Sequence, residues 1–125
     1  MSEPTVILGS ARTPIGKLGG TLSSVPATQL GSTAVRAAID RGGVSENEVD
    51  YVIMGNVLSA GLGQAPARQA SIGAGLPNTC SALTVNKVCA SGIMSVILAS
   101  LMVQSGDADV VIAGGMESMS RAPHV

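Results

Sequence analysis

Charged side chains are scarce in this sequence of 125 residues: Asp, Glu, Lys and Arg make up 12% of it, whereas hydrophobic residues make up 46%. A soluble domain of this size normally carries more charge on its surface. We therefore expect much of the chain to be covered by further polypeptide, either its own or that of a partner subunit. The formal net charge of -1 argues against nucleic acid as a partner, because phosphate binding needs clustered Lys and Arg.

Cysteine and histidine are also rare. The two cysteines, Cys80 and Cys89, are too few for the disulfide framework of a small secreted domain, although their pairing with each other stays open. The single histidine, His124, does not combine with them in any spacing known for metal sites, so we expect no metal. No basic segment precedes the first apolar run, as it would in a secretory signal. These features together predict a reducing, cytoplasmic setting.

An uncharged run from 88 to 106 is long enough to raise the question of a membrane span. Four serines and a glutamine interrupt it, which favours a helix buried inside a protein, and we expect no membrane partner. Apolar residues occur all round this helix, which predicts protein on every side of it. Ser91, Ser95 and Ala99 form a stripe of small residues that would let another element approach closely.

Strand-like and helix-like segments alternate along the chain. Apolar runs predict strands at 5–11, 49–59, 81–88 and 108–115, of which the third is the weakest. Helices are predicted over 26–43, within 61–77 and from about residue 89. This alternation predicts an α/β fold with a mostly parallel sheet covered by helices.

Two motifs suggest chemistry only weakly. The glycine-rich turns lack the spacing of nucleotide-binding loops, since Pro66 stands where a dinucleotide turn needs its third glycine. Tight turns are therefore the favoured interpretation. Glu117 follows a predicted strand, which is a plausible active-site position in an α/β sheet, but a single acid there is weak evidence.

Cys89 is the best candidate for a reactive group. If the long helix begins near it, the unpaired N–H groups of the first turn and the helix dipole would stabilise its thiolate. Burial in an apolar site would instead favour the neutral thiol. The residues alone support a nucleophile and an ordinary core cysteine equally. Cys80 has nothing nearby to stabilise a thiolate and is interpreted as a small, partly buried residue.

The stretch "NKVCASG" at 86–92, followed by "GDADVVIAGGMESMSRAPH" at 106–124, resembles the amino-terminal part of a thiolase. The segments "SARTPIGKLGG", "VIMGNVLSAGLGQAPARQA" and "AGLP" match the same family in order and spacing, so the resemblance covers essentially the whole chain. It is strongest to the short-chain, biosynthetic branch, which joins two acetyl-CoA into acetoacetyl-CoA and CoA. Degradative 3-ketoacyl-CoA thiolases are the alternative.

The resemblance implies a fold and an assembly. Residues 1–125 would be an incomplete thiolase N-terminal domain, comprising most of the N-terminal half of an αβαβα layered fold with a buried central helix. The loop domain and the C-terminal half would be absent. The weak third strand would pair with its twofold mate, so a homo-oligomer, either dimer or tetramer, is expected.

The resemblance also implies a mechanism. Cys89 would be the acyl-accepting cysteine, and its backbone N–H would be one of two donors to the oxyanion. Coenzyme A thioesters would be the substrates, with no further cofactor. The family's other active-site groups, a His, a Cys and an Asn, would come from a C-terminal portion that this chain lacks. His124 belongs to the "APH" match and is not the missing base.

Two classes of function stay open on this evidence. The chain could be an enzyme portion that acts with a C-terminal portion, or a non-catalytic, thiolase-like structural subunit. A relative of the ketoacyl synthases is a third possibility, but "AGGMESMS" favours a thiolase over that group.

Overall fold

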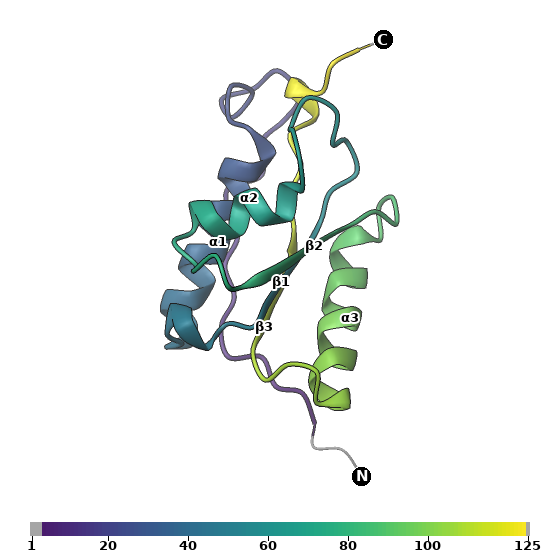
Figure 1. Ribbon diagram of the computed structural model, residues 1–125. Coiled ribbons are helices and arrows are strands. Elements are labelled where there is room, and N and C mark those ends of the chain that lie inside the picture. Colours follow the sequence, from purple (N-terminus) through teal and green to yellow (C-terminus); the bar gives the residue numbers. More distant parts are fainter. Residues whose placement is uncertain (1–3, 125) are drawn as a thin grey trace.

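The computed structural model describes residues 4–124, in which a three-stranded parallel sheet lies between helices on its two faces (Figure 1). The strands, in the spatial order β2-β1-β3, are β1 (Tyr51–Gly55), β2 (Ser81–Val85) and β3 (Val111–Gly115). The helices are α1 (Ala27–Gly42), α2 (Pro66–Gly73) and α3 (Ser91–Ser105), with short 3₁₀ turns η1 (Glu46–Glu48) and η2 (Met119–Arg121). The α/β prediction with a parallel sheet is confirmed.

Two crossover connections build the layers. Helix α2 links β1 to β2 on the face that α1 also covers, and α3 carries the chain from β2 past β1 to β3 on the opposite face (Figure 1). The central strand β1 is therefore covered on both sides. Val52, Ile53 and Met54 are each no more than 2% exposed. This explains why the strand is a continuous apolar run without polar alternation.

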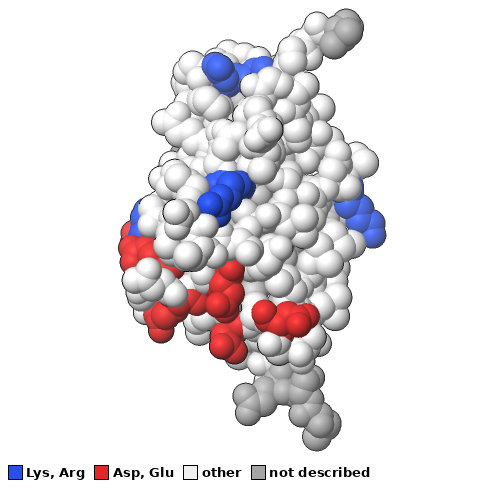
Figure 2. Space-filling model, viewed as in Figure 1, with Lys and Arg blue, Asp and Glu red and all other residues white. Residues whose placement is uncertain are grey.

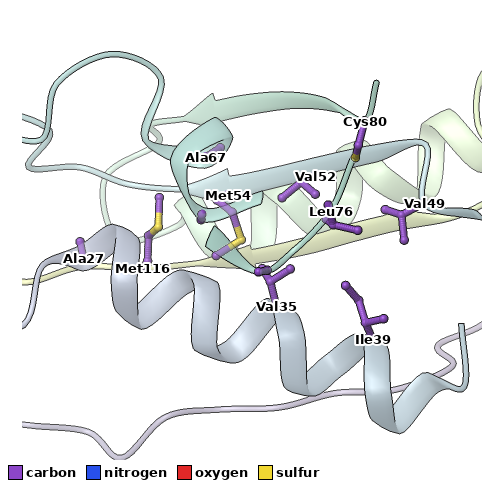
Figure 3. Packing of buried hydrophobic residues seen from close by; sticks show 12 residues of the cluster. Ala27, Val35, Ile39, Val49, Val52, Met54, Ala67, Leu76, Cys80 and Met116 are labelled. Atoms are coloured by element: carbon purple, nitrogen blue, oxygen red, sulfur yellow. The ribbon is translucent and has the colours of Figure 1, made fainter. Parts of the chain in front are cut away.

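The main core lies between the sheet and the α1/α2 layer. Val35 and Ile39 of α1 point toward Val52 and Met54 of β1 (Figure 3). Gly31 allows α1 to pack closely here, because a Cβ at this position would lie 2.5 Å from the Met116 sulfur. The core is thus built from aliphatic, alanine and methionine side chains in close contact.

Helix α1 has the limits that its sequence predicts. It begins after Pro26 and ends at Gly42, and the next residue, Gly43, adopts a left-handed conformation with φ of 65°. Glycine takes up such a conformation at no steric cost, and its amide caps the helix by reaching the carbonyl of Asp40.

The strand predicted at 5–11 is not formed. Residues 5–11 run without a strand partner among the residues that the structure describes, and Val6 and Ile7 are 68% and 82% exposed. Gly9 packs against the end of α1, where a Cβ would lie 2.6 Å from the amide nitrogen of Gly42. β-branched residues favour an extended backbone, but a strand also needs a neighbour for its N–H and C=O groups.

Helix α3 has one buried face and one exposed face. Its small-residue stripe of Ser91, Ser95 and Ala99 is buried, and the helix packs on β1 and β3. Ile93 and Leu101 are 61% and 56% exposed. The stretch from Val88 to Ser105 is apolar and long enough to span a membrane, but its contact with the sheet makes it a layer of an α/β domain. Burial on every side stays a prediction for the complete protein.

Candidate active site

Cys89 lies in the turn between β2 and α3, at the carboxyl ends of the strands. Helix α3 begins at Ser91 and has Ala90 as its N-cap, so the cysteine precedes the helix by two residues. The prediction that the helix begins near Cys89 is confirmed. The thiol is free and exposed, and Cys80 is also free, so the two cysteines are not paired.

The turn that carries Cys89 contains an unusual backbone conformation. Val88 has a φ of 50°, in the left-handed region that a β-branched residue rarely enters. The Val88 amide donates to Asn86 Oδ1 at 3.0 Å. Ser91 Oγ accepts from the Lys87 amide at 2.8 Å and donates to the Val88 carbonyl at 2.6 Å. These side-chain contacts hold the residue next to Cys89 in a strained conformation that its own sequence disfavours.

Replacing Val88 with glycine is expected to raise the free energy of unfolding. Relief of the left-handed conformation contributes about 1–2 kcal/mol, and the flexibility of glycine costs about 0.5–1 kcal/mol of that gain. Little packing is lost, since Val88 is 65% exposed. Val96→Gly, inside α3, is the comparison and should lower stability by about 1 kcal/mol. Denaturant unfolding measures both, and an equal loss in the two variants would contradict the strain at Val88.

Glycines at the ends of β1 and β3 allow the first turn of α3 to pack closely against these strands. A Cβ at Gly55, the last residue of β1, would lie 2.7 Å from the carbonyl carbon of Ser91. A Cβ at Gly115, the last residue of β3, would lie 3.5 Å from the Cα of Gly92. The buried Ser95 hydroxyl is 2.8 Å from the carbonyl oxygen of Gly114. The position of Cys89 relative to the sheet therefore depends on the absence of side chains at the strand ends.

Glu117 forms hydrogen bonds that connect the loop after β3 to the loop after β1. Its carboxylate accepts hydrogen bonds from Asn56 Nδ2 at 3.0 Å and from the amides of Val57 and Leu58 at 2.9 and 3.1 Å. Asn56 is buried and also donates to the Met116 carbonyl. The position after a strand is as predicted, but the carboxylate is engaged in holding the loops. Sequence reasoning missed Asn56, although a polar residue directly after an apolar strand was a usable signal.

Replacing Glu117 with alanine is expected to lower the free energy of unfolding by about 3 kcal/mol, because it leaves one N–H of the buried Asn56 side chain and two backbone amides without their acceptor. Asp109→Ala is the comparison, since no hydrogen bond of the Asp109 side chain occurs within residues 4–124 and its loss should stay within about 0.5 kcal/mol. Thermal or denaturant unfolding measures the difference. Equal effects of the two substitutions would show that the Glu117 contacts do not stabilise the chain.

The remaining sequence candidates have ordinary surroundings. Cys80 is buried in the main core, and this burial raises the pKa of its thiol. It is the small buried residue that the sequence indicates. His124 is exposed. Within the described part of the chain, no three His, Cys, Asp or Glu side chains gather in a way that could hold a metal ion.

Residues 5–125 match the thiolase N-terminal domain family. The chain belongs to the thiolase family. It is 57% identical over 120 residues to a mitochondrial acetyl-CoA acetyltransferase of Danio rerio, covering 96% of this chain and 29% of that protein. It is 54% identical over 121 residues to a cytosolic acetyl-CoA acetyltransferase of Gibberella zeae, covering 97% of this chain and 31% of that protein.

A thiolase from Ascaris suum, solved in complex with coenzyme A, has the same fold. It superposes with a TM-score of 0.95 at 41% identity, over 98% of this chain and 32% of that one. This thiolase chain thus spans about 30% of the length of the relatives it matches.

Proposed function

We propose that this thiolase chain provides the acyl-accepting cysteine, Cys89, for the interconversion of two acetyl-CoA with acetoacetyl-CoA and CoA. The observation that carries the proposal is an exposed, free thiol at the carboxyl ends of parallel strands, directly before α3. The names of the two acetyl-CoA acetyltransferase relatives support this choice of substrate.

In the first step, the Cys89 thiolate attacks the carbonyl carbon of acetyl-CoA. The bond between that carbon and the coenzyme A sulfur breaks, CoA leaves as a thiolate that takes up a proton, and the acetyl group stays on Cys89 as a thioester. In the second step, a second acetyl-CoA loses a methyl proton to a base of the C-terminal portion, and the resulting carbanion attacks the carbonyl carbon of the acetyl-cysteine. The bond between that carbon and the Cys89 sulfur breaks, Cys89 leaves as a thiolate, and acetoacetyl-CoA is formed.

The backbone of the turn supports an oxyanion role for the Cys89 amide. The Val88 amide donates to Asn86 and the Ala90 amide donates to the Lys87 carbonyl. The Cys89 amide between them has no hydrogen-bond acceptor in the described part of the molecule. It is thus free to donate to the oxygen of the tetrahedral intermediate, where one such donor typically contributes about 3–4 kcal/mol.

The rest of the active site belongs, in this proposal, to a C-terminal portion that supplies a His, a Cys and an Asn. The exposed apolar face of α3 and the low charge content support such a covering portion. The outer edge of β2, unpaired among residues 4–124, supports pairing with a second copy of the chain. A cytoplasmic location is part of the proposal; relatives with cytosolic and mitochondrial names match about equally well.

The test is to incubate the full-length protein that contains this chain with acetyl-CoA, quench it with acid and map the acetyl group by mass spectrometry. We expect an acetyl thioester on Cys89 that disappears when free CoA is added, because the transfer is reversible. Acetylation at another residue, or none at Cys89 while the protein still makes acetoacetyl-CoA, would overturn the proposal.

A further inference from the structure

Charge in this molecule is separated along the direction of the strands. Acidic side chains gather in the lower part of Figure 2, around the amino ends of the strands. Asp50 directly precedes β1, and its carboxylate accepts hydrogen bonds from the amides of Asp109 and Val110, just before β3. Six acids lie at this end: Asp40, Glu46, Glu48, Asp50, Asp107 and Asp109.

Three cations also lie at the amino end, and their contacts stay within it. Arg36 pairs with Asp40 and Glu46. Arg68 donates to the carbonyls of Asn78 and Cys80, just before β2. With Arg41 in the last turn of α1, these cations leave the amino end with a formal charge of -3.

The carboxyl end has the opposite balance. Its four cations are Arg12, Lys17, Lys87 and Arg121. The single carboxylate described there is Glu117, which already accepts three hydrogen bonds. The formal charge of this end is therefore +3. No ion pair neutralises any of its four cations among the residues that the structure describes.

One of these cations is close to Cys89 in the sequence, and two others line a cavity at the end of β3. Lys87 is exposed and precedes Cys89 by two residues. Arg12 and Lys17 line a cavity of about 330 Å³ that also borders Gly115. The same Gly115 backbone lies against Gly92 in the first turn of α3, so the cavity reaches the strand end on which the start of α3 packs.

We propose that this cationic carboxyl end attracts negatively charged electrophiles to Cys89, with Lys87 as the main contributor. The ligand class is an anionic, phosphate-bearing thioester, so the inference rests on the proposed function in taking Cys89 as the acceptor. A surface that carries charge of one sign raises the local concentration of an oppositely charged reagent. Dissolved salt screens this attraction at distances beyond the Debye length, which is about 10 Å at 0.1 M.

The test compares two reagents that alkylate the same thiol, the anion iodoacetate and the neutral iodoacetamide. The full-length protein is treated with each, and the rate at Cys89 is read by mass spectrometry. We expect the ratio of the iodoacetate rate to the iodoacetamide rate to exceed that of N-acetylcysteine by about two- to threefold at low salt, as one or two nearby charges predict. The excess should disappear in 0.5 M NaCl. A ratio equal to that of N-acetylcysteine, or one that salt does not change, would overturn the inference.

Two variants locate the effect. Lys87→Gln should lower the ratio by about twofold, since it removes the charge that lies nearest to Cys89 in the sequence. Arg41→Gln removes the same charge at the opposite end of the sheet and should leave the ratio unchanged. Equal effects of the two variants would refute the role of the carboxyl end, because they would reflect net charge alone.

A neutral thioester separates this inference from the proposed function. S-acetyl-N-acetylcysteamine carries no charge, so its transfer of an acetyl group to Cys89 does not depend on the cationic end. If this reagent acetylates Cys89 but the thiol shows no preference for iodoacetate over iodoacetamide, the result would contradict the charge inference alone. Failure of the reagent to acetylate Cys89, with the iodoacetate preference intact, would count against the acyl-acceptor role alone.

Discussion

Replacing Cys89 with alanine is expected to lower the thiolysis of acetoacetyl-CoA by at least about a thousandfold, because in the proposed function Cys89 is the group that takes up the acetyl group as the covalent intermediate. The measurement uses the full-length protein, with the C-terminal portion present. The fold should be retained, because the Cys89 side chain is exposed and surface substitutions usually change the free energy of unfolding by less than about 0.5 kcal/mol.

Cys80 provides the control for this substitution. It is the second thiol of the chain, but it is buried in the core and its raised pKa keeps it protonated. Cys80→Ala should leave the thiolysis rate unchanged and lower the free energy of unfolding by about 1 kcal/mol, the result of a small cavity. Full activity in the Cys89 variant, or loss of activity in a folded Cys80 variant, would show that Cys89 is not the acceptor.

The fold could be predicted from the sequence wherever local signals and tertiary contacts agree. Helix α1 has glycines at its end, and β1 and β3 are apolar runs that form strands, of which β1 is buried. Residues 5–11 carry an equally good strand signal but form no strand, because their conformation depends on a partner that a local pattern does not specify.

The candidate site could be predicted only in part. The motif and the start of a long apolar run predicted a helix that begins near Cys89, and α3 begins two residues after it. The left-handed Val88 could not be anticipated, since it is held by Asn86 and Ser91 through the geometry of one turn. The contact between Glu117 and Asn56 joins residues 61 positions apart. Interactions over such sequence separations arise from the register of the sheet, which composition and periodicity do not encode.

Gly55 shows how that register controls the site, and its substitution by alanine is expected to affect both stability and acetyl transfer. The added methyl group would lie 2.7 Å from the carbonyl carbon and the Cβ of Ser91, and 2.9 Å from the Gly92 amide nitrogen. Carbon atoms in contact need about 3.5–4.0 Å, so α3 must move away from β1 by roughly 1 Å. Overpacking of this kind typically lowers the free energy of unfolding by about 1–3 kcal/mol, and we expect the upper part of that range because the opposing atoms are mainly backbone.

The same displacement should reduce acetyl transfer by up to about a hundredfold, because a misplacement of 1 Å is enough to disrupt a reacting geometry. Gly92→Ala is the control, because it adds the same methyl group in the first turn of α3, where no described heavy atom outside that stretch of helix lies within 4 Å of the new carbon. Because alanine favours a helix over glycine by about 1 kcal/mol, this variant should be more stable than the parent. Denaturant unfolding and the acetylation rate of Cys89 measure both effects. If the Gly55→Ala variant unfolds at the same denaturant concentration as the parent and its Cys89 is acetylated at the same rate, the close packing of α3 against the end of β1 does not position the thiol.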